Sequence, residues 1–168
     1  LRLAYGMDGW FQAQLLERQL MLHHRAASPL KNVDAIDQAL NAPLDFPEVG
    51  LAFVPGDHAA VVIDVDTPDA DLVFAALWKR MEGAGVRPED LTLIQPAVWK
   101  TVQGLDPRAA LPAGIRDQFK LLRHDPTEEG SCAYLASTAG NERVYLNRAL
   151  TDADVVLTIG PAEFDPVL

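Results

Sequence analysis

The sequence predicts an α/β fold, with a mostly parallel sheet flanked by helices, a β-hairpin and short N-terminal strands. Three short apolar runs rich in β-branched residues, at 58–65, 91–96 and 154–160, are typical of strands buried on both faces. Apolar residues at helical spacing lie between the first two runs. A strand, a helix and a second strand within about 35 residues form one βαβ unit, so these two strands are expected to be parallel.

The N-terminal segment alternates apolar and polar residues at 1–5 and again at 11–15, which predicts two short strands around a turn at 6–8. Its content of Gln, Leu, Glu and Arg leaves a helix as the alternative. Asn32 is a candidate cap for a helix over Val33–Asn41. The apolar residues expected on one face of that helix are Val33, Ile36 and Leu40.

The βαβ unit starts with the strand sequence AAVVIDV and turns through DVDTPDAD into a helix that begins near Ala70. Asp69 and Asp71 suit the positive N-terminal end of this helix, and Gly83 and Gly85 are expected to close it. The sequence LTLIQP then predicts the second strand. The helix is expected to bury the stripe Val73, Phe74, Leu77, Trp78 and Met81.

The C-terminal half is expected to add further strands. Residues 101–114 indicate a loop with a short helix, and 119–122 indicate a strand. An Ala-Gly-Asn turn between 134–137 and 143–146 predicts a β-hairpin. The apolar run DVVLTIG at 154–160 predicts a third strand of the buried type.

The chain is expected to form one domain, 1–168, whose core is large enough to need no disulfide or metal. Its single cysteine, Cys132, excludes an internal disulfide and is expected to be a small buried residue. Four dispersed histidines without cysteine partners at zinc spacing predict no metal site. A reducing, cytoplasmic location is therefore expected.

Charge and hydropathy exclude two classes of partner. The chain has 14 basic and 24 acidic residues, a formal net charge of −10 at pH 7. Such a surface repels polyanions, which argues against nucleic acid and anionic membrane surfaces as partners. No apolar run approaches the roughly 20 residues of a membrane span, and no basic segment before an apolar stretch marks a signal peptide.

Three loops are expected to share one ligand site. They are 64–69 (DVDTPD), 95–100 (QPAVWK) and 160–165 (GPAEFD), and each follows an apolar strand. In an open α/β sheet, ligands bind outside the carboxyl ends of the strands. The polar residues of these loops are therefore the candidates for binding and chemistry.

Several roles are open to these side chains. Asp64 and Asp66 lie two residues apart, so they are candidates to hold a cation, orient a basic group or bind ligand hydroxyls; the alternative is that they satisfy a turn and cap the next helix. Lys100 would bind a carboxylate or phosphate, or is a solvated lysine. Glu163 and Asp165 would act as acid and base, or are exposed carboxylates.

The succession of segments along nearly all 168 residues resembles the N-terminal domain of the nickel-dependent lactate racemase family. LRLAYG resembles the family's opening strand, and ALNAPLDFPEV its helix end and proline-rich segment. The best stretch runs over 121–160, where the family has a His-Asp, a Gly-x-Thr-x-x-Gly turn, a Val-Asn-Arg and an Ala-Asp before a strand ending in Gly. The residues that fit this frame are Thr138, Gly140, Asn147, Arg148, Asp152, Asp154 and Gly160, while Ala136 replaces a glycine.

The resemblance implies racemisation or epimerisation of 2-hydroxy acids. The family uses a nickel pincer cofactor derived from a pyridinium nucleotide and bound between two domains. Hydride passes transiently from the substrate carbon to the cofactor, assisted by histidines, while an Arg and a Lys hold the substrate carboxylate. The resemblance places the cofactor-bearing Lys and the nickel-ligating His in a C-terminal partner domain beyond Leu168, so no cofactor is expected on this chain alone.

The chain departs from the family at its functional positions. Its DVDTP sequence aligns with the family's D-x-T-R-P, and its AVWK with G-T-H-R. The resemblance places Asp64, Asp66 and Pro68 at cofactor-binding positions, Thr67 and Lys100 at substrate-binding positions, and Trp99 and Asp165 at the catalytic histidine positions. Thr and Trp cannot shuttle a proton at neutral pH, and Thr cannot form a bidentate carboxylate clamp.

Two functions follow as hypotheses. The chain is either part of a racemase or epimerase relative with an altered substrate and altered acid and base groups, or a non-catalytic ligand-binding or structural domain that keeps only the fold. Under both, the isolated chain is expected to show no turnover.

Overall fold

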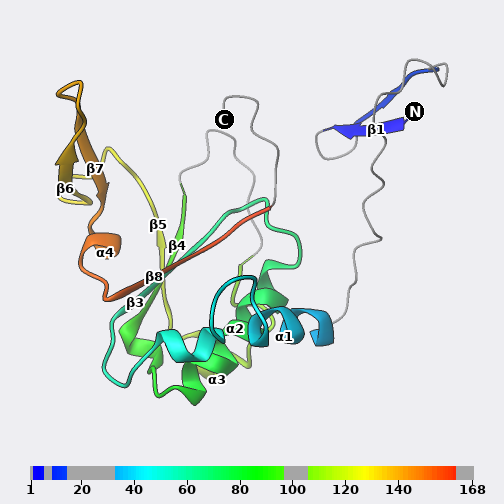
Figure 1. Ribbon diagram of the computed structural model, residues 1–168, viewed down its shortest axis with the longest axis horizontal. Coiled ribbons are helices and arrows are strands. Elements are labelled where there is room, and N and C mark those ends of the chain that lie inside the picture. The colour runs from blue at the N-terminus through cyan, green and yellow to red at the C-terminus, as the bar shows by residue number, and fades with distance from the viewer. Residues whose placement is uncertain (1, 6–8, 15–32, 97–105, 162–168) are drawn as a thin grey trace. The chain divides into compact units, whose positions relative to one another are not determined.

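The structure, a computed structural model, describes residues 2–5, 9–14, 33–96 and 106–161 and divides the chain into two compact units, Leu1–Lys31 and Asn32–Leu168. In the first unit, β1 (Arg2–Tyr5) and β2 (Gly9–Gln12) pair as antiparallel strands (Figure 1). The prediction of two N-terminal strands is confirmed, and the helix alternative is wrong for these residues. The predicted turn at 6–8 and the Asn32 cap lie outside the described residues.

The second unit contains a four-stranded parallel sheet in the order β5-β4-β3-β8. Val61 of β3 pairs with Leu93 of β4 and Leu157 of β8, and Leu93 pairs in turn with Leu121 of β5. The strands are β3 (Ala59–Ile63), β4 (Leu91–Gln95), β5 (Lys120–Arg123) and β8 (Val155–Ile159). The predicted α/β class with a mostly parallel sheet is confirmed.

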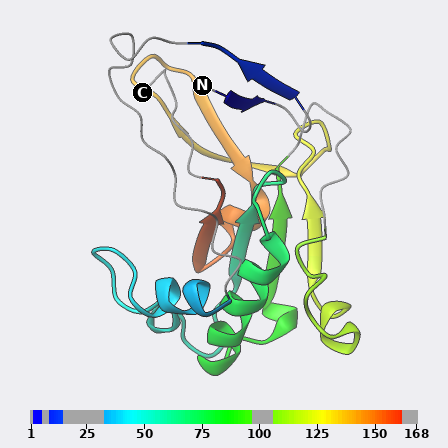
Figure 2. The same ribbon diagram turned by 90° about the vertical axis from the view of Figure 1, so that its right-hand side faces the viewer.

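Four α-helices and two 3-10 helices accompany the described strands. They are α1 (Val33–Asn41), η2 (Val49–Ala52), α2 (Ala70–Gly83), η3 (Pro88–Asp90), α3 (Ala113–Arg116) and α4 (Arg148–Thr151). Helix α2 lies against the sheet (Figure 2). Within the described ranges, no helix is long and apolar enough to cross a membrane.

The hydrophobic core lies between α2 and one face of the sheet. Phe74 and Met81 are fully buried, and the ring of Phe119 meets Phe74 and Trp78 edge-on at centroid distances of 5.4 and 4.7 Å. The strands contribute alternate residues to this core, namely Ala59, Val61, Ile63, Leu91 and Leu93. Because side chains alternate along a strand, the intervening residues face the other side of the sheet.

Strand β8 differs from the prediction that it is buried on both faces. Val155, Leu157 and Ile159 pack against the core, whereas Val156 is 43% exposed and Thr158 is also exposed. The reason is its place at the end of the strand order, where β3 is its only partner among the described residues. An edge strand with one covered face needs apolar residues only at alternate positions.

Helix α1 packs on α2 through its polar side as well as its apolar one. Arg80 of α2 bonds the Asp37 carboxylate at 2.7 Å and the Asn41 side chain at 3.1 and 3.2 Å. Leu40 packs against the core, whereas Val33, the first residue of α1, is 50% exposed.

The predicted hairpin is confirmed as β6 (Cys132–Ser137) and β7 (Arg143–Asn147) (Figure 1). The rings of Tyr134 and Tyr145 meet at 5.8 Å, and Asn141 takes a positive φ of 67° in the turn. Cys132 is half-buried rather than buried, because it starts a ribbon that has only two strands among the described residues.

Candidate functional site

Four residues form a row across the sheet where its strands end. The ladder continues one residue past the strands, because the Asp64 amide donates to the Ile159 carbonyl and the His124 amide to the Gln95 carbonyl, both at 2.9 Å. The residues that directly follow β5, β4, β3 and β8 therefore stand in one row, on the face of the sheet opposite α2. We call these residues, His124, Pro96, Asp64 and Gly160, the edge row.

The first and third predicted loops start at Asp64 and Gly160, after the adjacent strands β3 and β8. The second starts beside Pro96, after β4, which lies between β3 and β5. Asp64, Pro96 and Gly160 are half-buried or exposed, so solvent reaches the row. Trp99, Lys100, Glu163 and Asp165 lie outside the described residues. Their roles as catalytic, substrate-binding and acid or base residues therefore stay predictions, as does the expectation that all three loops converge.

The loop after β3 folds into a tight turn. Asp64 accepts the Thr67 amide on its carbonyl at 3.1 Å and the Asp66 amide on its carboxylate Oδ1 at 3.0 Å. The turn alternative is thus confirmed for Asp64. The capping alternative is wrong, because the N-cap of α2 is Asp69, which makes no side-chain cap bond.

Thr67 lies at the boundary between β3 and β8. Its half-buried side chain places Oγ1 3.5 Å from the Ile159 carbonyl, to which the hydroxyl donates. Pro68 and Asp66 are exposed at the tip of the turn. The loop therefore presents one hydroxyl, one partly engaged carboxylate and one exposed carboxylate, with no positive charge among residues 64–68.

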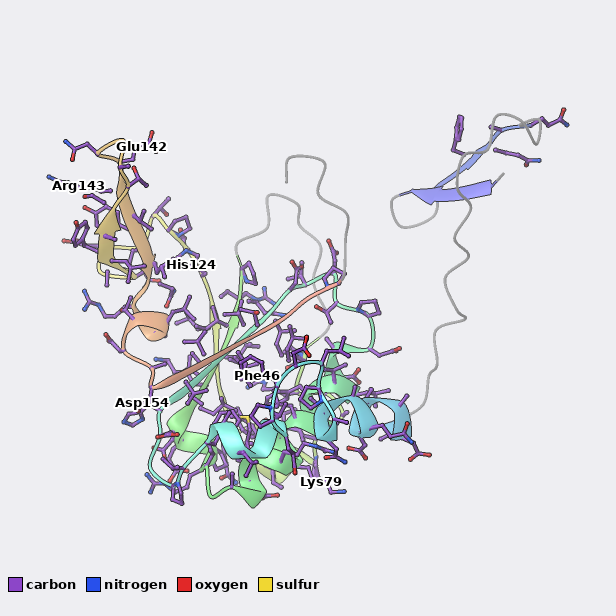
Figure 3. All side chains as sticks on the ribbon, in the orientation of Figure 1. Phe46, Lys79, His124, Glu142, Arg143 and Asp154 are labelled. Carbon is purple, nitrogen blue, oxygen red and sulfur yellow. The ribbon has the colours of Figure 1, made fainter. Side chains whose placement is uncertain are left out.

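His124 completes the edge row, and in the sequence it is one of four dispersed histidines. Figure 3 labels His124. Its Nδ1 lies 2.9 Å from Nδ2 of Asn147, which is 6% exposed. The Oδ1 atom of the same amide accepts the Ala149 amide at 2.9 Å and caps α4. One buried side chain therefore joins the sheet edge to the start of α4.

A hollow of about 300 Å³ borders this region, between β5, the 125–131 turn and the start of α4. Charges of both signs line it, including Lys120, Arg148 and Asp152. The Asp125 carboxylate accepts the amide and hydroxyl of Thr127 at 2.8 and 2.6 Å, and these hydrogen bonds lower the pKa of Asp125. The turn is thus held by its own side chains.

The family model of the lactate racemase N-terminal domain matches residues 8–166. The chain belongs to this family. A solved structure, the lactate racemase apoprotein from Thermoanaerobacterium thermosaccharolyticum, is similar with a TM-score of 0.52 and 14% identity. The match covers 75% of this chain and 31% of that one, so it extends over less than a third of the solved racemase. No curated protein sequence matches significantly.

The described residues of this lactate racemase family member do not fit a nickel site. Within 2–5, 9–14, 33–96 and 106–161, no three His, Cys, Asp or Glu side chains gather as a metal would require. One carboxylate oxygen of Asp64 already accepts the Asp66 amide within its own turn. His58 lies 3.8 Å from Asp90, but the Asp90 carboxylate is already bonded by Arg87 at 2.7 and 3.1 Å.

Proposed function

We propose that this chain is the N-terminal domain of a protein related to the racemases and epimerases of 2-hydroxy acids. In this proposal the sheet edge still binds a small hydroxy acid, while the positions of the family's carboxylate-binding Arg and two catalytic His carry Thr67, Trp99 and Asp165. Membership of the lactate racemase family supports the first part. The alignment of DVDTP and AVWK with the family's D-x-T-R-P and G-T-H-R supports the second for Thr67 and Trp99.

Thr67 is the observation that carries the proposal. An Arg binds a carboxylate through two parallel hydrogen bonds, whereas a threonine offers one donor and no charge. That one donor faces a backbone carbonyl 3.5 Å away. The substrate carboxylate would therefore depend on Lys100, and base chemistry on Asp165, since Trp99 has no titratable group.

The cofactor in this proposal is a nickel pincer nucleotide held mainly by a C-terminal partner domain, which would supply hydride transfer when bound. Asp64, Asp66 and Pro68 would contact it from this chain. The described residues of this chain supply no ligand set for nickel.

A second candidate is a non-catalytic domain that keeps the fold. It is favoured by the absence of any Lys or Arg from the edge row and from residues 64–68. With a net charge of −10, the chain also offers little general attraction for an anionic acid. A chiral assay of lactate on the longest available form of the protein separates the two candidates, because only the first predicts interconversion of the enantiomers.

The first test places a positive charge at residue 67, where the family has an Arg. Thr67→Arg should raise the affinity for lactate about tenfold or more, because a charge-assisted hydrogen bond contributes roughly 1.5–3 kcal/mol. Thr67→Gln is the matched control, since it adds length and hydrogen bonds without charge. The measurement is titration of each variant with lactate, followed by NMR shifts or calorimetry. Equal affinities of the Arg and Gln variants would show that residue 67 does not face a carboxylate site.

A further inference from the structure

The hairpin of β6 and β7, which we call the ribbon, leaves apolar side chains open on both faces. Tyr134 and Tyr145 lie opposite each other on one face and are 56% and 50% exposed. Leu146, on the other face, is 38% exposed. The described residues add no third strand to this sheet. Because two strands alone are only marginally stable in water, a third strand or a packed partner is needed to complete such a sheet.

The ribbon also has a hollow on the face of the two tyrosines. It measures about 530 Å³ and is lined by Tyr134, Ser137, Asn141, Arg143 and Tyr145. Tyrosine and arginine are enriched in protein–protein interfaces, and serine and asparagine supply adaptable hydrogen bonds in them. The lining therefore has the composition of a surface that binds protein.

Hydrogen bonds at both ends of the ribbon show which backbone groups of β7 are free. Near α4, the Arg148 amide donates to the Ser131 carbonyl at 2.8 Å. At the turn, the Thr138 amide donates to the Glu142 carbonyl at 2.9 Å. Bonded and non-bonded pairs alternate along an antiparallel ladder, so the even-numbered residues of β7 bond to β6. The amide and carbonyl of Tyr145 therefore point to the outer edge of β7, where the described residues place no strand.

This outer edge is better suited to a further strand than the outer edge of β6. The register of β6 shifts between Tyr134 and Ala136, which indicates a β-bulge, whereas β7 is regular from Arg143 to Asn147. Bulges twist an edge strand and oppose the addition of another strand. A strand that joins the ribbon is therefore expected to add to β7.

The charges of the ribbon favour a second copy of the chain as the source of that strand. Glu142 and Arg143 are the only charged residues between Cys132 and Asn147, so the ribbon is neutral in a chain of net charge −10. Two copies therefore repel each other least where their ribbons meet. Glu142 lies at the tip of the ribbon, and Arg148 lies at its other end, where α4 starts (Figures 1 and 3). Within the described part of the chain, neither of these two side chains makes an ion pair.

We propose that β7 pairs antiparallel with β7 of a second copy of this chain, about a twofold axis at Tyr145. Each Tyr145 then donates its amide to the carbonyl of the other. The same register places Val144 beside Leu146 of the other copy. It also places Glu142 beside Arg148 of the other copy, and the symmetry repeats both contacts.

Neighbouring twofold registers match the two copies less well. An axis at Arg143 places two like charges opposite each other, and an axis at Val144 places Glu142 beside Leu146. With the proposed axis, the turn of one ribbon meets the α4 end of the other. A hollow of about 300 Å³ borders Arg148 there and leaves space for the turn.

Charge reversal tests this register. Sedimentation equilibrium of the 168-residue chain should show a weak, reversible dimer, as expected for a small interface. Glu142→Arg and Arg148→Glu should each weaken the dimer about tenfold, because like charges then face each other at two places. The double variant should restore it. The two residues are six positions apart in the chain, roughly 20 Å along a strand, so they cannot compensate each other within one copy.

Glu82→Arg is the matched control, because it makes the same change of charge at an exposed position of α2. It should not weaken the dimer. Glu142→Arg also makes the net charge less negative, so general repulsion between copies cannot explain a loss of association. Circular dichroism confirms that each variant is folded.

Amide hydrogen exchange followed by NMR tests the edge without any variant. The Tyr145 amide should exchange quickly in dilute solution and slowly at concentrations where the dimer forms. The Val144 amide, which bonds to β6, should be protected at both.

A chain that sediments as a monomer at every concentration up to the millimolar range would overturn the proposal. So would a dimer that Glu142→Arg does not weaken, or one that the double variant fails to restore, because the contact between copies would then lie elsewhere. A Tyr145 amide that exchanges equally fast in monomer and dimer would show that β7 is not the edge used.

Discussion

Asp106 and Arg108 form a two-pronged ion pair before β5. Arg108 bonds the two carboxylate oxygens of Asp106 at 3.0 and 2.9 Å and also donates to the Phe119 carbonyl at 3.0 Å. The hydrogen bond from Arg108 lowers the pKa of Asp106, and the same bond raises the pKa of Arg108. The pair therefore ties the 106–111 segment to the start of β5.

We expect Asp106→Asn to lower the free energy of unfolding at pH 7 by about 0.5–1 kcal/mol, the range for a solvent-accessible pair. A carboxylate whose pKa is lowered in the folded state stabilises the protein above its unfolded pKa, near 3.9, and this stabilisation is lost as the pH falls through the folded value. Urea unfolding of both proteins at pH 7 and pH 3 measures the gap, which should narrow at pH 3.

The control is Asp117→Asn, whose single bond to Arg116 is 3.4 Å long and whose side chain is 74% exposed. It should have little effect at either pH. A gap for Asp106→Asn that is equally large at pH 3 would mean that lost packing, not charge, is responsible.

At this scale the sequence predicted part of the candidate site. It identified Asp64 and Thr67 because they follow an apolar strand, and that position implies the carboxyl edge. It did not identify the hydrogen bond between His124 and Asn147, because the two residues are 23 positions apart in the chain. Hydrogen bonds between residues so distant in the chain leave no periodic pattern.

At the scale of elements, the end of α2 depends on two glycines in different ways. Gly85 has a φ of +89°, and a Cβ there would lie 2.9 Å from the Cγ of Pro55. Gly83 is the last residue of α2, has no such φ, and has open space where a Cβ would stand. The two positions are therefore a natural matched pair.

Gly85→Ala should destabilise the protein by about 1–3 kcal/mol, from the left-handed backbone together with the contact with Pro55. Gly83→Ala should be neutral or stabilising by up to about 1 kcal/mol, because alanine favours the helix. Thermal and urea unfolding of the two variants measure the difference. Equal stability of both variants would contradict this account of the helix end.

Most elements were predictable because each combines a periodic pattern of apolar residues with turn residues that end the element. The α2 stripe, the β3 and β4 runs and the hairpin turn are of this kind. The burial of β8 was not predictable from the sequence. An edge strand and a central strand can have the same run of apolar residues and differ only in the strands beside them.

At the scale of the whole molecule, the core that the described residues form lies in one unit. Its members and the residues packed against it run from Leu40 to Ile159, within the unit Asn32–Leu168. This agrees with an independently stable second unit, whatever the first contributes.

We expect a fragment of residues 32–168 to unfold cooperatively, with a midpoint within a few degrees of that of the full chain. Near-ultraviolet circular dichroism should keep the signal of the buried Trp78, which packs on Phe119. Loss of that signal, or a gradual transition, would show that residues 1–31 are needed for the core.

Because of the strand order, the ribosome synthesises β3 long before its partner strand β8. Ala59 pairs with Val155, 96 residues later. At about 5–20 residues per second, a ribosome needs roughly 5–20 s to translate that interval. During this time one side of β3 has no native strand beside it, so the nascent chain exposes unpaired backbone groups that favour aggregation. The yield of folded protein in a cell therefore depends on how well that side of β3 is protected until β8 has been synthesised.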